Sequence, residues 1–156
     1  MHTTIRGILA AIALLSAATF AAPLGAQTAA DSAGIRAAAL DYIDGWYAGD
    51  AARMERALHP ELAKRIVATD PATGQSRIGQ MGASVLVNQT REGGGSDIPT
   101  ASRRNEVRIF EIYNNTASVR VTATGWIDYM HLAKWNGQWK IVNVLWQVEP
   151  RQATRP

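Results

Sequence analysis

Cysteine is absent from this chain of 156 residues, which excludes disulfide bonds, thiol catalysis and zinc sites built on thiolates. Histidine is scarce, and after the N-terminal segment only His59 and His131 occur. Neither has acidic neighbours at a metal-ligand spacing, so we predict no metal site and no cofactor. Core packing or subunit pairing must supply the stability of the fold.

The chain also lacks a block of like charge and, after its first 26 residues, a long apolar run. Its formal net charge is +3, with basic and acidic residues interspersed. Arg103, Arg104 and Arg108 form the densest basic group, but neutral and acidic residues separate them, as is typical of a solvated strand edge. We therefore predict no nucleic-acid binding, and no membrane attachment once the N-terminal segment is removed.

The N-terminal segment has the three parts of a secretory signal peptide. A short basic start is followed by an apolar stretch over residues 7–20 and by small residues up to Ala26. We predict cleavage after Ala26, with cleavage near Ala21 or retention as an anchor as alternatives. Residues 27–150 then form a single domain and residues 151–156 a disordered tail, and the mature protein is expected to be secreted or periplasmic.

Helical periodicity marks three segments in the first half of the predicted domain. Apolar residues at three- and four-residue spacing predict a helix over residues 32–48, with Tyr42 and Trp46 on its apolar face. Asp50 is placed to cap a second, short helix, because its carboxylate can accept from the first free amides. A third helix is predicted near residues 81–86. The domain therefore begins with helices.

Strand signals dominate the second half, with one earlier hairpin. An amphipathic stretch over residues 61–67 is expected to end in a small hairpin with Ile78, and glycines 93–95 predict a flexible surface loop. Residues 106–113 and 117–124 predict two strands joined by a turn. Helices followed by antiparallel strands predict an α+β domain, in which a strongly curved sheet packs on three N-terminal helices as a cone.

Residues 126–147 indicate one long β-hairpin that turns at Asn136 and Gly137, since both residues accept the positive φ angles of a type I′ turn. Counting outward from this turn places Met130 opposite Asn143. One face then carries Trp126, Asp128, Met130, Leu132, Trp139, Ile141, Asn143 and Leu145. The other carries Ile127, Tyr129, His131, Trp135, Val142, Val144 and Trp146. Both faces are largely apolar, so each is expected to pack against another part of the chain or against a partner.

The second of these faces is expected to be the outer face of the sheet and predicts a homodimer, because a large apolar patch on a soluble chain marks a partner surface. We expect the contact to form through Ile127, Tyr129, Val142, Val144 and Trp146. His131 lies among these aromatic and aliphatic side chains, so it is interpreted as a subunit contact and not as a catalyst.

The first face and the first helix supply the candidate ligand-binding residues. Asp128 is predicted among apolar side chains, where it is either a base or ligand anchor or a structural carboxylate satisfied by Asn143 or Tyr42. Aromatic residues here either stack a flat heterocycle or form core. Lys64 and Arg65 are interpreted as solvated surface, with recognition of an anion at the pocket mouth as the alternative. The predicted lining is Tyr42, Trp46, Trp126, Asp128, Met130 and Asn143.

Five segments are informative when taken together: Tyr42 to Asp50, Leu58 to Leu62, Lys64 and Arg65, Trp126 to Leu132, and Asn136 to Trp146. This combination resembles the Putative lumazine-binding family of the nuclear transport factor 2-like (SnoaL-like) superfamily. The resemblance implies a cone-shaped α+β fold, often dimeric, and a lumazine-type ligand. Steroid isomerases of this superfamily place a tyrosine where Tyr42 stands, but their general-base aspartate would fall near Ile66, which argues against that reaction.

Three functional hypotheses follow. The first is a secreted or periplasmic, non-catalytic domain that binds a small organic molecule in an apolar pocket. The second is an isomerase, cyclase or hydrolase that uses Asp128 as base and Tyr42 as hydrogen-bond donor. The third is a dimeric interaction module. No residue set forms a catalytic signature, so Asp128 and Tyr42 are the only catalytic candidates.

Overall fold

The computed structural model describes residues 24–150, which form three α-helices and one six-stranded sheet. The helices are α1 (Leu24–Ala48), α2 (Ala51–Ala57) and α3 (Ala83–Arg91), and a 3-10 turn, η1, spans Thr100–Ser102. The strands are β1 (Leu58–Thr69), β2 (Ser76–Met81), β3 (Asn105–Tyr113), β4 (Thr116–Ala123), β5 (Trp126–Trp135) and β6 (Gln138–Val148). Residues 1–23 of the expected signal peptide and the expected tail, 151–156, lie outside the described residues.

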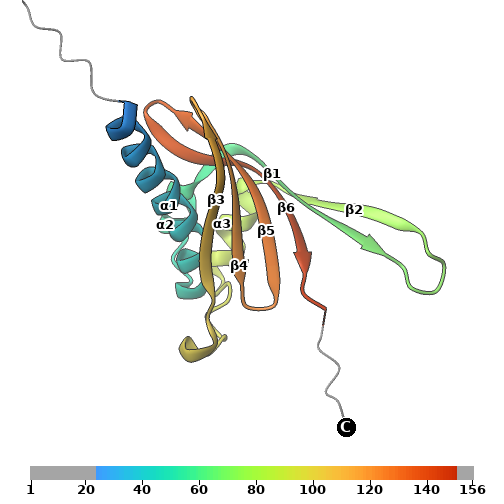
Figure 1. Ribbon diagram of the computed structural model, residues 1–156. Coiled ribbons are helices and arrows are strands. Elements are labelled where there is room, and N and C mark those ends of the chain that lie inside the picture. The colour runs from blue at the N-terminus through green and yellow to red at the C-terminus, as the bar shows by residue number, and fades with distance from the viewer. Residues whose placement is uncertain (1–23, 151–156) are drawn as a thin grey trace, which may run out of the picture.

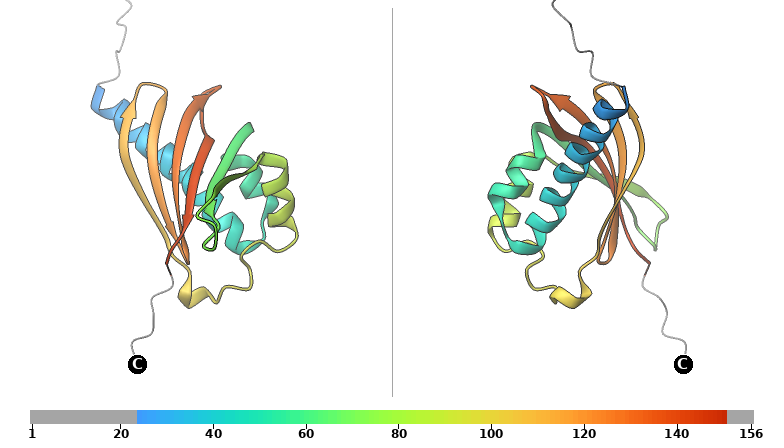
Figure 2. Two further views of the ribbon diagram at one scale, coloured as in Figure 1. Left: turned by 90° about the vertical axis from the view of Figure 1, so that its right-hand side faces the viewer. Right: turned by 60° about the vertical axis from the view of Figure 1, so that its left-hand side comes forward.

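All three helices lie on one face of the curved sheet (Figures 1 and 2). The strand order is β2-β1-β6-β5-β4-β3, and every neighbouring pair is antiparallel except β1 and β6, which run parallel. The β1–β2 hairpin extends away from the rest of the molecule (Figure 1). This arrangement confirms the predicted α+β fold of helices on a strongly curved sheet.

Helix α1 packs its apolar stripe against the concave face of the sheet. Ile35, Ala39 and Ile43 are fully buried and belong to one core with Val121 of β4 and Ile141 of β6. The helix ends at Ala48, as predicted, but begins at Leu24 and not at residue 32. Alanine, which has the highest helix propensity, recurs in the residues before 32 and favours this extension.

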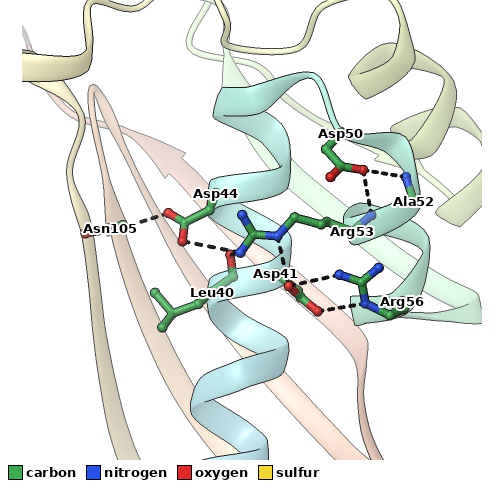
Figure 3. Close-up of polar contacts among 8 residues, drawn as sticks. All are labelled: Leu40, Asp41, Asp44, Asp50, Ala52, Arg53, Arg56 and Asn105. Atoms are coloured by element: carbon green, nitrogen blue, oxygen red, sulfur yellow. Dashed lines mark hydrogen bonds and ion pairs between the residues drawn. The ribbon is translucent and has the colours of Figure 1, made fainter.

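Charged side chains join α1 to α2 (Figure 3). Asp50 caps α2 as predicted, since its Oδ1 atom accepts from two backbone amides of that helix at 3.0 Å. Arg53 Nε lies 2.9 Å from Asp41 Oδ1, Arg56 Nε lies 3.1 Å from Asp41 Oδ2, and Arg53 also reaches Asp44. Burial tends to raise the pKa of Asp41, but the hydrogen bonds from both arginines outweigh it and lower that pKa. These ion pairs link the two helices.

The stretch over residues 61–67 is part of β1, which pairs with β2 on one side and β6 on the other. Val67 lies opposite Ile78, so the small hairpin is confirmed. Side chains alternate along the strand. Leu62 and Lys64 are therefore buried on the helix side, with relative exposures of 4% and 5%, while Arg65 points to the outer face.

The long hairpin and its turn are confirmed near the loop, with φ angles of 49° at Asn136 and 78° at Gly137. Leu132 lies opposite Ile141, as predicted. Beyond this pair β6 carries one extra residue, Val142, and the register shifts by one. Asn143 consequently pairs with His131, and the predicted pairing of Met130 with Asn143 is wrong.

This bulge exchanges the two faces of β6 beyond residue 142, because side chains alternate with a period of two. Val144 is fully buried and Trp146 turns toward the helices, whereas both were predicted on the outer face. Leu145 is 50% exposed on the outer face, where it pairs with Tyr129. Asn143 faces outward too. The predicted placement of these four side chains is therefore wrong, and the outer apolar surface differs from the one expected.

Candidate functional site

A cavity of about 130 Å³ opens between the helices and the β1–β6–β5 part of the sheet. Its walls are mostly aromatic and aliphatic, with one amine, one amide and one phenol hydroxyl as polar groups besides the indole N–H groups. The lining residues are Tyr42, Trp46, Lys64, Met81, Leu86, Gln89, Trp126 and Trp146. Small-molecule sites have this composition, an apolar wall with a few placed polar groups.

The fold brings these side chains together from distant parts of the sequence. Tyr42 and Trp46 are one turn apart on α1 and so lie on the same face of that helix. Trp126 begins β5 and Trp146 lies near the end of β6, at the same end of the hairpin. Helix α3 supplies Gln89, which is exposed and marks the mouth.

A hydrogen-bonded ion pair lies at the inner end of the cavity. Lys64 Nζ donates to Asp128 Oδ1 at 2.5 Å and to Tyr42 Oη at 2.7 Å. Asp128 Oδ2 accepts from the Tyr42 hydroxyl at 3.1 Å and from Trp126 Nε1 at 2.8 Å. Side-chain exposure is 6% for Lys64 and 0% for Asp128. A buried charge pair needs such additional hydrogen bonds to offset its loss of hydration.

Burial changes the protonation of two members of this network. Desolvation lowers the pKa of Lys64, although the charge of Asp128 and its hydrogen bond act in the opposite direction. Desolvation and then the neighbouring Asp128 carboxylate raise the pKa of Tyr42 well above its ordinary value. Tyr42 is therefore a neutral donor at any physiological pH, and the lysine amine is more easily deprotonated than one in water.

The six residues predicted to line the cavity lie in different parts of the structure. Tyr42, Trp46 and Trp126 line the cavity. Asp128 lies behind Lys64 and is not part of the lining, while Met130 is 1% exposed in the core. Asn143 lies on the opposite face, where its Oδ1 accepts from Arg65 at 3.1 Å and its Nδ2 is 3.4 Å from His131. The bulge at Val142 is the cause of this last error.

Lys64, Trp146, Met81, Leu86 and Gln89 complete the lining and were not among the predicted site residues. The interpretation of Lys64 as solvated surface is wrong. Its burial follows from strand pairing, and Leu62 and Ile66 flank it at the two-residue spacing of a strand face. That alternation was a signal for an inward Lys64. No comparable local pattern predicts that the Trp146 side chain points inward, because the bulge reverses the face on which it lies.

The glycine run over residues 93–95 packs against the cavity wall. The Gly95 amide donates to the Trp46 carbonyl at 3.0 Å, and Gly95 is buried. A Cβ added at Gly94 would lie 2.5 Å from the Trp46 carbonyl oxygen, and one at Gly95 would lie 2.6 Å from Trp46 Nε1. The glycines therefore permit a close approach to Trp46 and are more than the flexible surface loop that was expected.

Neither a cluster that could hold a metal ion nor a helix that could cross a membrane occurs in the range that the structure describes, residues 24–150. Within it, no cluster of three or more His, Asp or Glu side chains is arranged to hold a metal ion. None of the helices described is long and apolar enough to cross a membrane. His131 is exposed on the outer face of the sheet, and the His59 and Trp135 rings form a T-shaped pair with centroids 4.9 Å apart. Neither histidine lines the cavity.

Comparison with solved structures supports the fold. An NTF2-like protein of unknown function from Silicibacter pomeroyi DSS-3 has a TM-score of 0.59 and 15% identity, over 78% of this chain and 98% of its own. One from Methylobacillus flagellatus KT has a TM-score of 0.58 and 20% identity, over 78% and 94%. An NTF2-like protein with a cystatin-like fold from Novosphingobium aromaticivorans has a TM-score of 0.58 and 13% identity, over 85% and 94%.

The sequence comparisons are more specific. No curated protein sequence matches the chain significantly. A family model described as "Putative lumazine-binding" matches residues 30–147, which include every residue that lines the cavity. The solved structures show that the fold is NTF2-like, and the family match shows that the chain belongs to the Putative lumazine-binding family.

Proposed function

We propose that this protein binds a small, flat organic molecule in the cavity between its helices and the curved sheet. The observation that carries the proposal is the aromatic lining, in which Tyr42, Trp46, Trp126 and Trp146 surround one buried amine. Aromatic side chains offer planar ligands large contact areas in a fixed geometry. The family description points to the same class of ligand.

The hydrogen-bond inventory of Lys64 defines the polar group that the ligand needs. An ammonium group has three donors, and Asp128 and Tyr42 take two of those of Lys64. The third N–H has no protein acceptor among the contacts of the described residues. A ligand with a carbonyl or another acceptor on its ring edge would satisfy this donor.

The cavity volume limits how much of the ligand can be enclosed. An engineered protein cavity of about 150 Å³ admits benzene. The 130 Å³ cavity is similar, so it encloses one ring of a ligand. A second fused ring, as in lumazine, would lie at the mouth beside Gln89, whose amide offers both donors and an acceptor.

Isothermal titration with lumazine tests the proposal, with two tryptophan variants as a matched pair. Trp46→Ala is expected to weaken binding at least about 10-fold, because stacking of a base on an aromatic side chain contributes about 1 to 3 kcal/mol. Trp135→Ala removes the same side chain from a site that is 54% exposed and outside the cavity, and should leave the affinity unchanged. Equal affinities in both variants, or no binding by the natural protein, would contradict the proposal.

We favour binding over catalysis by Asp128, the alternative raised by the sequence. Asp128 does not line the cavity, and three donors already occupy its two oxygen atoms. A general base must reach the proton that it removes, directly or through one water. The network fits a carboxylate that holds Lys64 and Tyr42 in place.

The proposal includes export of the protein to the periplasm or the medium. The support is the order of basic, apolar and small residues in segment 1–26, which is that of a signal peptide.

A dimer through the outer face of the sheet is a further part of the proposal. The bulge at Val142 changes which β6 side chains form this surface, since Leu145 is on it and Val144 is not. Tyr129 and Leu145 are 49% and 50% exposed there, and Val67 and Ile78 extend the apolar area onto β1 and β2. Leu145→Glu is expected to convert a dimer into a monomer in light scattering at micromolar concentration. Val85→Glu, at a 45% exposed site on α3, should not change the mass. A monomeric natural protein would refute the dimer.

A further inference from the structure

We propose that Lys64 captures its ligand covalently, because its amine is placed to form a reversible imine with an aldehyde or ketone group on a planar ring. The inference rests on the proposed function, since the cavity must first admit such a ring. It goes beyond that function by naming a carbonyl as the reactive group and Lys64 Nζ as the nucleophile.

The position of the amine carries the inference. The Lys64 side chain is 6% exposed, yet it forms part of the cavity wall. Its Nζ atom lies 4.9 Å from the centroid of the Trp146 ring and 5.4 Å from that of Tyr42. An aromatic ring stacked in the cavity would therefore bring a carbonyl substituent close to Nζ. Holding two reacting groups in contact replaces a bimolecular encounter by an intramolecular one.

A lysine attacks a carbonyl only as the neutral amine, so its proton needs an acceptor. Asp128 Oδ1, 2.5 Å from Nζ, is that acceptor. Transfer of the proton leaves a neutral amine beside a neutral carboxylic acid, a pair that costs less to bury than two charges. The lowered pKa of Lys64, caused mainly by desolvation, acts in the same direction. Buried lysines are the usual imine-forming lysines for this reason.

The reaction balances without an oxidant, a reductant or a second substrate. The Nζ lone pair attacks the carbonyl carbon and forms a C–N bond, and a proton passes from the nitrogen to the carbonyl oxygen through a solvent water. Asp128, which contacts Nζ and not the ligand, then gives its proton to the nitrogen. A second proton passes from the nitrogen to the hydroxyl group, and the C–O bond breaks with release of water. The products are a protonated imine, an Asp128 carboxylate beside it and one water, and hydrolysis reverses every step.

The lysine content of the chain makes the test simple. Only three lysines occur in the sequence, Lys64, Lys134 and Lys140. Lys134 forms an ion pair with Asp31 and Lys140 donates to the Arg56 carbonyl, and neither touches the ligand cavity. They serve as internal controls within the same protein molecule, so the comparison does not depend on a variant that folds.

The experiment treats the natural protein with 4-hydroxybenzaldehyde and borohydride at neutral pH, and locates the reduced adduct by peptide mass spectrometry. We expect Lys64 to be modified at least 10-fold more than Lys134 or Lys140. An excess of 4-hydroxybenzyl alcohol, the same ring without the carbonyl, should protect Lys64 by competition. Lys64→Arg keeps the positive charge but cannot form the imine, and should give no adduct above the level of the other two lysines.

Quenching of tryptophan fluorescence by both compounds distinguishes the two ways in which the test can fail. If aldehyde and alcohol both quench, but Lys64 reacts no more than the other lysines, covalent capture is refuted and the binding function stands. If neither compound quenches and Lys64 is not selectively modified, the cavity does not take planar rings, and both the proposed function and this inference are overturned.

Discussion

Lys64→Met is expected to lower the free energy of unfolding by about 3 kcal/mol, because a buried ion pair that loses one partner leaves an uncompensated charge. Asp128 is fully buried, and Lys64 is the only donor to its Oδ1 atom among the described contacts. Tyr42 and Trp126 still donate to Oδ2, which keeps the loss at the lower end of the range for such pairs. Urea denaturation at neutral pH, followed by tryptophan fluorescence, measures the change.

Two further variants separate loss of charge from loss of side chain. Lys140→Met makes the same replacement at a partly exposed lysine, and should change stability by less than about 0.5 kcal/mol. Adding Asp128→Asn to Lys64→Met removes both charges, and the amide oxygen can still accept from Trp126. The double variant should be more stable than Lys64→Met by at least about 1 kcal/mol. A double variant that is less stable would show that the buried charge is not the source of the loss.

The same pair predicts how stability depends on pH. Desolvation lowers the pKa of Lys64 in the folded protein, with Asp128 opposing the shift. Between this lowered pKa and the ordinary value of 10.5, the unfolded chain binds more protons at Lys64 than the folded chain does. The free energy of unfolding therefore rises with pH in that window. The stability gap between the natural protein and Lys64→Met should widen, and not narrow, as the pH is raised toward 10.5.

Gly94→Ala is expected to destabilise the protein by about 3 kcal/mol and to abolish ligand binding. Gly94 has a φ angle of +54°, a conformation that costs an L-residue about 1 to 2 kcal/mol. The new methyl group would also lie 2.5 Å from the Trp46 carbonyl oxygen, and overpacking of this kind costs about 1 to 3 kcal/mol. Relief of the clash must move the loop or Trp46, and Trp46 lines the cavity.

Gly74→Ala is the matched control for this variant. Gly74 has a similar φ angle of +70°, but a Cβ atom there would have no neighbour within 4 Å. Gly74→Ala should lower the free energy of unfolding only by the cost of the positive φ angle, about 1 to 2 kcal/mol. Its ligand affinity should equal that of the natural protein. Thermal unfolding and the lumazine titration measure both effects. Equal losses of stability in the two variants would show that the close approach to Trp46 does not matter.

Local patterns predicted most of the fold because their causes are local. Asp50 caps a helix through amides two and three residues away, and Asn136 with Gly137 sets the turn through its own backbone angles. The register near that turn follows from the turn itself, so Leu132 opposite Ile141 was predictable. Of the predicted site residues, Tyr42, Trp46 and Trp126 lie in the cavity wall.

The errors arose where distant segments determine a side chain's direction. One extra residue, Val142, reverses the face of every later position on β6, and no local pattern in the sequence marks it. As a result, Trp146 lines the cavity, although it was predicted on the outer face. Asn143 lies on the outer face, although it was predicted in the lining. Lys64 looked like surface because a lysine in isolation favours water.

The sequence by itself determined the α+β class, the family, the position of the hairpin turn and the aromatic side chains available for a cavity, since periodicity and turn chemistry act over a few residues. The alternation along β1 indicated an inward Lys64, but the tertiary structure alone supplied its partner, because Asp128 lies 64 positions away and reaches it only through the pairing of β1, β6 and β5. A buried amine requires a carboxylate within contact distance, and only the folded sheet brings that carboxylate to it.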